Sequence, residues 1–155
     1  MTTIPTTDTN TTVPAAAAAA AFDDSAGPAD PVDEATRAAS LVDAYLAAFS
    51  APDDDERANL VTRAWAPDGH FADPLFAATG HDELIALAAS VPELYPGHRF
   101  ARTSGIDLHH DHARYTWVFE AADGTPVIEG VDVAQIGAAD RLVRVIGFFG
   151  PVPPA

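Results

Sequence analysis

The chain has 155 residues, which suits a single domain built around one hydrophobic core. It carries 23 acidic residues against 8 basic ones and has a net charge of −15, so its surface repels nucleic-acid phosphates and anionic lipid. These numbers argue against nucleic-acid partners and membrane-surface roles. The absence of cysteine excludes disulfides, thiolate metal sites and cysteine nucleophiles.

Residues 1–29 are rich in Thr, Ala, Asp and Pro. They predict a disordered tail, because they cannot bury enough apolar surface to offset the entropy of ordering. The apolar run at 15–21 is too short to span a bilayer, and no basic residue precedes it as in a secretory signal. We therefore expect a cytoplasmic protein with one domain over residues 30–151 and a short tail over 152–155.

Apolar residues at helical spacing predict three helices in the first part of the domain. The expected helices span 30 to about 50, 53–65 and 82 to about 90. Asp30 and Asp53 are typical caps for the first two, and Trp65 belongs to the buried face of the second. Pro92 is expected to end the third helix, because proline has no N–H to continue it.

From residue 98 onward the apolar residues alternate with a period of two, which predicts strands and no further helix. The expected strands are 100–109, 113–120, 126–136 and 141–149. Helices first and strands afterwards indicate an α+β domain with its helices on one side of an antiparallel sheet.

Asp73 ends a short expected strand at 70–73, after a predicted turn at Pro67-Asp68-Gly69. Its neighbours in the sequence are apolar. Burial among them would raise the pKa of its carboxyl group and make it a proton acceptor near neutral pH. The alternative is a turn, because the residue before a proline avoids the helical region and an aspartate bonds its own downstream backbone.

Asp132 is a second carboxylate in an apolar setting, since period-two counting places it on one strand face with Ile128 and Ile136. A carboxylate there must be protonated, hydrogen-bonded or paired. The alternatives are an edge position open to water and an ion pair with Arg144. Tyr45 lies in the apolar stripe of the first helix, where a core tyrosine with a satisfied hydroxyl is the alternative to a functional role.

Three histidines and an aspartate form a polar turn at His109, His110, Asp111 and His112. Such a cluster suggests a metal site, but a catalytic zinc needs three ligands that converge in a pocket, and a hairpin tip is usually exposed. A solvated turn is the better interpretation. No metal ion or cofactor is expected.

The order of these elements resembles the nuclear transport factor 2-like superfamily. The residues that carry the resemblance are the three helices, the short strand with Asp73-Pro74, and the four strands that end in Gly147-Phe148-Phe149-Gly150. SnoaL-like members of the superfamily include polyketide cyclases and ketosteroid isomerases. The resemblance covers residues 33–150 and implies a cone-shaped α+β fold. In it, three N-terminal helices pack on a strongly curved antiparallel sheet and enclose an apolar pocket.

By its resemblance to ketosteroid isomerases, the chain would use Asp73 as general base and Tyr45 and Asp132 as donors to a developing oxyanion. The residues expected to bind substrate are Phe71, Trp65, Trp117 and Phe148. The implied function is a cofactor-independent isomerase or cyclase that moves protons on a small, apolar, carbonyl-bearing molecule. A non-catalytic module that binds a small apolar ligand or a protein partner is the alternative. The superfamily also implies a homodimer formed through the outer sheet face.

Overall fold

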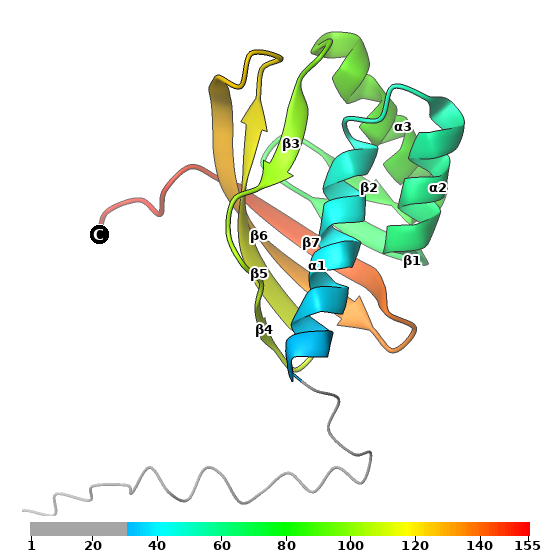
Figure 1. Ribbon diagram of the computed structural model, residues 1–155, viewed down its shortest axis with the longest axis vertical. Coiled ribbons are helices and arrows are strands. Elements are labelled where there is room, and N and C mark those ends of the chain that lie inside the picture. Colours follow the sequence, from blue (N-terminus) through cyan, green and yellow to red (C-terminus); the bar gives the residue numbers. More distant parts are fainter. Residues whose placement is uncertain (1–30) are drawn as a thin grey trace, which may run out of the picture.

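The structure is a computed structural model and describes residues 31–155. Three helices lie on one side of a curved sheet of seven strands (Figure 1). The tail expected over residues 1–29 and the cap expected at Asp30 lie outside the described residues. Within the described part of the chain, no helix is long and apolar enough to cross a membrane.

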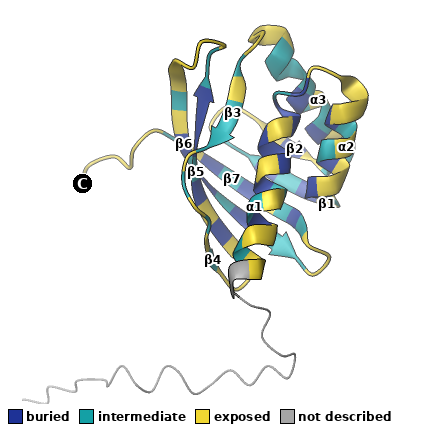
Figure 2. Ribbon diagram, in the orientation of Figure 1, coloured by how far each residue is buried: buried dark blue, intermediate teal, exposed yellow. Residues whose placement is uncertain are grey.

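The helices are α1 (Pro31–Ala48), α2 (Asp54–Ala64) and α3 (Gly80–Leu94). The start of α2 is capped as expected, because the carboxylate of Asp53 accepts the backbone N–H of Glu56 at 2.9 Å. This bond satisfies one of the N–H groups that have no partner within the first helical turn. The side of α1 that faces the sheet is buried, whereas Figure 2 shows its outer side exposed.

Helix α3 continues past Pro92 to Leu94, which corrects the expectation that this proline ends it. Pro92 lies in the last turn, where its missing N–H removes a single helical hydrogen bond. The backbone N–H of Tyr95 still donates to the carbonyl of Val91 at 2.8 Å. The helix therefore closes normally around the proline.

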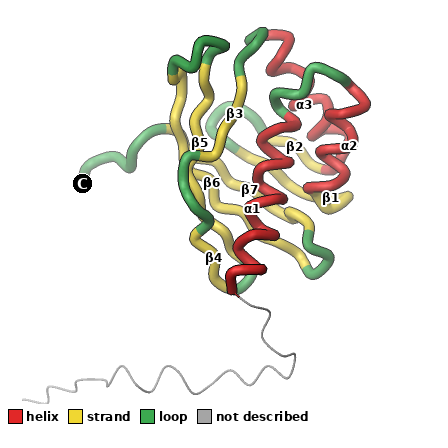
Figure 3. Tube along the Cα trace, viewed as in Figure 1, coloured by secondary structure: helices red, strands yellow, loops and turns green. Residues whose placement is uncertain are grey.

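The strands are β1 (Trp65–Ala72), β2 (Ala77–Thr79), β3 (Arg99–Arg102), β4 (Asp107–His109), β5 (His112–Glu120), β6 (Pro126–Gly137) and β7 (Arg141–Phe149). Their order across the sheet is β2-β1-β7-β6-β5-β3, and β4 also pairs with β5 (Figure 3). The sheet is antiparallel except between β1 and β7, which run parallel. The wholly antiparallel sheet expected from the sequence is wrong at this pair.

Strand β1 begins at Trp65, earlier than expected, and runs through Pro67-Asp68-Gly69, so the turn predicted there is wrong. Its register with β7 shifts between Trp65 and His70, so the turn-forming residues make an irregularity within the strand. A Cβ atom at Gly69 would lie 2.7 Å from the ring of Trp65. The glycine therefore leaves space for that ring in the core.

The strand expected over 100–109 is two strands, β3 and β4, because the chain leaves β5 after Thr103, whose N–H still donates to the carbonyl of Thr116. At the break, the hydroxyl of Ser104 accepts the N–H of Thr116 at 2.9 Å. A side chain thus satisfies a donor that a continuous strand would satisfy with a backbone carbonyl. The expected bounds of the last strand are confirmed, and those of β5 and β6 differ from the prediction by one residue at one end.

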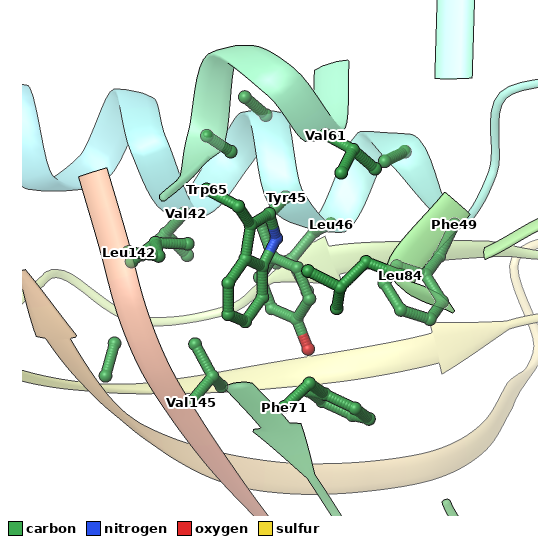
Figure 4. Close-up of a cluster of buried hydrophobic side chains, with 14 of the residues drawn as sticks. Val42, Tyr45, Leu46, Phe49, Val61, Trp65, Phe71, Leu84, Leu142 and Val145 are labelled. Atoms are coloured by element: carbon green, nitrogen blue, oxygen red, sulfur yellow. The ribbon is translucent and has the colours of Figure 1, made fainter. Parts of the chain in front are cut away.

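The hydrophobic core lies between the helices and the inner face of the sheet. Alternate residues of β5 from Ala113 to Phe119 are buried on that face. Figure 4 shows Tyr45 among the core side chains beneath α1, with its hydroxyl directed away from the helix. Its ring centroid lies 5.4 Å from that of Trp65 and 6.1 Å from that of Phe71. Tyr45 therefore reaches from α1 into the interior of the sheet.

Candidate functional site

A cavity of about 180 Å³ lies between α1, α3 and the inner face of the sheet. Most of its lining is aliphatic or aromatic. Among the lining residues only Asp73, Ser90 and Asp132 are neither. The hydroxyl of Ser90 donates within α3, to the carbonyl of Leu87 at 2.7 Å. The two carboxylates and the hydroxyls of Tyr45 and Tyr95 are therefore the polar groups of the lining that can meet a ligand in this apolar space.

Asp132 projects from β6 into the closed end of the cavity and is 1% exposed. The indole Nε1 of Trp117 donates to its Oδ1 at 2.7 Å. The hydroxyls of Tyr115 and Tyr45 donate to its Oδ2 at 3.1 Å and 3.4 Å. Asp132 is thus neither at a water-exposed edge nor paired with Arg144, which is exposed. Hydrogen bonding explains its burial.

Burial raises the pKa of Asp132 to about 6, although its three hydrogen-bond donors act in the opposite direction. The negative charge of Asp73 adds to the rise. The pKa values of Tyr45 and Tyr115 are also well above normal, first because of burial and then because of the charge on Asp132. Both phenols therefore stay protonated near neutral pH, whereas Asp132 changes between its two forms there.

Two glycines make room for this arrangement. Gly130 faces Trp117 across the β5–β6 pair, and a Cβ atom at Gly130 would clash with the indole ring. The ring therefore lies against bare backbone, with its Nε1 at Asp132. Gly147 faces Asp132 across the β6–β7 pair, and a Cβ there would lie 3.0 Å from Asp132 Oδ1 and 3.3 Å from the Cβ of Asp73. The absence of a side chain at Gly147 thus leaves room for both carboxylate residues.

Asp73 directly follows β1 and is half-buried. Its Oδ1 accepts the backbone N–H groups of Leu75 and Phe76, each at 2.7 Å. These bonds form the turn given above as the alternative, yet the side chain also lines the cavity. The apolar neighbours do not bury it as the sequence suggested, because Leu75 and Phe76 are themselves exposed.

The structure brings Tyr45, Asp73 and Asp132 together with two of the four expected substrate-binding residues, Phe71 and Trp117. Trp65 is a core residue that does not line the cavity, and its edge-on contact with the ring of Tyr45 helps to hold that ring (Figure 4).

Phe148 is a further correction, since it is exposed and does not line the cavity. Phe149 lines the cavity in its place, because it pairs with Gly130 on the inner face of the sheet. Counting by two along β7 from Gly147 would have selected Phe149.

Sequence reasoning missed Tyr115 as a partner of Asp132. The two residues are directly opposite each other in the β5–β6 pair. Aligning the strands on either side of the turn at Asp123-Gly124 would have predicted this contact, because directly opposed side chains lie on the same face. Tyr115 does not line the cavity. It therefore acts on Asp132 from the core side.

The histidine-rich turn lies between β4 and β5. His109, His110 and His112 are exposed, and Nδ1 of His112 lies 2.6 Å from a carboxylate oxygen of Asp111. Over residues 31–155 there is no group of three or more His, Cys, Asp or Glu side chains that could hold a metal ion.

No protein-family model matches the chain, and no curated protein matches its sequence significantly. Solved structures do resemble it. One is a protein from Agrobacterium tumefaciens strain C58, provisionally named an isomerase of the SnoaL-like family, with 30% sequence identity and a TM-score of 0.70. The match covers 75% of this chain and 99% of that protein.

Two further structures share the fold at lower identity. A protein of Sinorhizobium meliloti, provisionally named a polyketide cyclase, is 18% identical with a TM-score of 0.54, and the match covers 69% of this chain and 92% of that one. A protein of Jannaschia sp. CCS1, provisionally named a SnoaL-like polyketide cyclase, is 12% identical with a TM-score of 0.61. The match covers 79% of this chain and 90% of that one.

Proposed function

The chain belongs to the SnoaL-like family of nuclear transport factor 2-like proteins, and on that premise we propose that it is a cofactor-independent isomerase or cyclase. Its substrate would be a small, apolar molecule with a carbonyl group. The reaction would be a proton transfer at the carbon next to that carbonyl.

The observation that carries this proposal is the convergence of Tyr45 and Asp132 at the closed end of an apolar cavity. The Tyr45 hydroxyl oxygen and Asp132 Oδ2 are 3.4 Å apart, and both residues line the cavity. When Asp132 is protonated, both groups can donate to one ligand oxygen. Two donors fixed in a site with little water stabilise negative charge on that oxygen.

Asp73 is suited to the role of base. Its Oδ1 accepts the two backbone N–H groups of the turn, and among the described residues Oδ2 has no hydrogen-bond partner. In the proposed step, the Asp73 carboxylate takes a proton from the carbon beside the carbonyl. The C–H electron pair becomes a C=C bond, and the carbonyl oxygen takes on negative charge that Tyr45 and Asp132 stabilise. Returning the proton to another carbon completes an isomerisation. In a cyclisation the enolate carbon instead attacks a second carbonyl, whose oxygen takes the electron pair of the C=O bond and then the proton held by Asp73.

The protonation of Asp132 determines the pH range of this activity. With a pKa of about 6, Asp132 is mostly protonated below pH 6 and mostly ionised above it in the unliganded site. An apolar ligand that displaces water from the cavity disfavours the charged form further. Ligand binding is therefore expected to be accompanied by proton uptake.

The hydrogen bonds of Asp73 also favour a second candidate function. Two backbone donors to its Oδ1 are explained fully by the turn that it forms. On this reading the protein is a non-catalytic binding module for a small apolar ligand or a protein partner. The same cavity and the same pair of donors would hold a ligand carbonyl without proton transfer.

The conversion of cyclohex-3-en-1-one to its conjugated isomer tests the proposed reaction, because its single ring suits the cavity and the product absorbs in the ultraviolet. We expect the wild type to accelerate the conversion and Asp73→Asn to lose on the order of 10²-fold or more of that rate. The matched control is Asp68→Asn, an exposed aspartate that does not line the cavity. It should keep the wild-type rate. A wild type that binds the ketone without converting it supports the binding module instead.

A further inference from the structure

The cavity is polar at its closed end and apolar at its mouth. Tyr45 and Asp132 are 5% and 1% exposed, whereas the mouth is formed by large apolar side chains that are 48–66% exposed. We call this group the apolar rim, and it consists of Leu75, Phe76, Leu94, Tyr95 and Val127. Of the seven large apolar side chains exposed in the described part of the chain, five belong to the rim. Apolar side chains gathered around one opening indicate a binding surface.

The rim is assembled from three separate segments. Leu75 and Phe76 belong to the turn after β1, Leu94 and Tyr95 to the end of α3, and Val127 to the start of β6. The ring of Tyr95 packs edge-on against Phe119, with centroids 5.6 Å apart. Since Phe119 lines the cavity, this contact joins the rim to the inner wall.

The cavity is small for a molecule of more than one ring. Its volume is about 180 Å³. An engineered apolar cavity of about 150 Å³ in another protein is filled by benzene. A six-membered ring with a small substituent therefore fits here, and any larger part of a ligand must leave through the mouth and lie on the rim.

From the change between the polar closed end and the apolar mouth, we propose that the ligand has two parts. One is a ring-sized head whose carbonyl enters first, and the other is an uncharged apolar chain or ring system that lies across the rim. The direction of the head rests on the proposed function, which places the carbonyl oxygen at Tyr45 and Asp132. The rim disfavours a charged tail, because its side chains offer no ion pair, and the net charge of −15 further repels an anionic one. The occupant of the rim is thus the rest of the ligand molecule.

A series of 4-n-alkylcyclohexanones tests this binding mode. The ring and its carbonyl stay constant while the alkyl chain grows from methyl to hexyl, and the dissociation constant of each ketone is measured by calorimetry. Burial of each added methylene on the rim should tighten binding about threefold to fourfold. The increase should continue beyond ethyl, after the cavity itself has been filled. An affinity that stops rising at ethyl, or a series in which no member binds, overturns the proposal.

A variant of the rim then tests where the alkyl chain of the ketone lies. Replacing Leu75 and Leu94 together by serine should weaken binding of the hexyl ketone about tenfold and leave the methyl ketone unchanged. Phe148→Ser is the matched control, since Phe148 is similarly exposed but lies outside the cavity. It should bind the whole series as the wild type does. Equal weakening of the methyl and hexyl ketones in the rim variant contradicts the proposal.

These binding measurements are separable from the reaction. If the affinity increases along the series and falls in the rim variant while cyclohex-3-en-1-one is not converted, the proposed chemistry fails and the binding mode stands. If conversion occurs but the series shows no increase beyond ethyl, the chemistry stands and the two-part ligand is wrong.

Discussion

Asp132 is the residue at which burial and hydrogen bonding act most strongly against each other. Loss of water around its carboxylate favours the neutral form, while Trp117, Tyr115 and Tyr45 all donate to the ionised form. Burial has the larger effect, because the pKa is raised to about 6 despite the three donors. The result is a carboxyl group that can act as a hydrogen-bond donor under mildly acidic conditions.

This raised pKa predicts a pH-dependent effect on stability. In the folded protein Asp132 binds its proton up to about pH 6, whereas in the unfolded chain it loses the proton near the ordinary value of 3.8. Between these values the folded state binds more protons, so the contribution of Asp132 to the unfolding free energy falls as pH rises. The loss of unfolding free energy caused by ionising the buried Asp132 is the penalty. It is absent below about pH 4 and complete above about pH 6, where it amounts to about 3 kcal/mol.

Urea unfolding of the wild type and Asp132→Asn from pH 4 to pH 7 measures this penalty. The asparagine carries no charge, so the stability of the variant relative to wild type should increase by up to about 3 kcal/mol across the range. Taking the difference removes the titration of the other acidic residues. A difference that stays constant, or one that decreases with pH, would show that Asp132 is not held above its ordinary pKa.

At the scale of elements, three neighbouring strands hold the two carboxylates in place. Strand β7 lies between β1, which ends just before Asp73, and β6, which carries Asp132. Gly147 of β7 is the point where both approach, and it has no side chain to keep them apart. The parallel β1–β7 pair is therefore what brings Asp73 to the cavity.

We expect Gly147→Ala to destabilise the protein by about 1–3 kcal/mol and to weaken ketone binding. The added methyl group would lie 3.0 Å from Asp132 Oδ1, which cannot move away without stretching its 2.7 Å bond to Trp117. Gly105→Ala is the control, because a Cβ atom there meets nothing within 4 Å. Thermal unfolding and calorimetry with cyclohexanone measure the two effects. Wild-type affinity in Gly147→Ala would show that the carboxylates have more room than the structure gives them.

Elements were predictable from the sequence where local chemistry determines them. The cap at Asp53 and the extent of the last strand, Arg141–Phe149, need only neighbouring residues, and the structure confirms both. The start of β1 and its parallel partner were not predictable, because they depend on β7, which is distant in the sequence. The turn predicted at Pro67-Asp68-Gly69 is wrong for the same reason, because these residues belong to β1, within the segment where its register against β7 shifts.

The same distinction holds for the candidate site. Asp132 stood out because a carboxylate on an apolar strand face requires hydrogen bonds or a proton, and three donors meet it. Its partner Tyr115 required the register of the β5–β6 pair. The sequence alone could not show that Trp65 fills the core and does not line the cavity. A buried aromatic residue has the same sequence pattern in both positions.

At the scale of the whole molecule, the fold creates a gradient from a polar interior end to an apolar mouth. Helix α1 brings Tyr45 from one layer, and the sheet brings Asp132 and Asp73 from the other. Neither layer alone contains both proposed donors to the carbonyl oxygen of the ligand. The central claim is therefore that the two layers together bind a ligand carbonyl through Tyr45 and a protonated Asp132.

The affinity for cyclohexanone at pH 5 and pH 8 tests this claim most directly, because a ketone oxygen only accepts hydrogen bonds. With an Asp132 pKa of about 6, the donor form is nearly complete at pH 5 and scarce at pH 8. We expect binding on the order of tenfold or more weaker at pH 8. Asp132→Asn keeps a donor at both values and should show no such change. Wild-type affinity that is equal at the two pH values, or tighter at pH 8, would contradict the account.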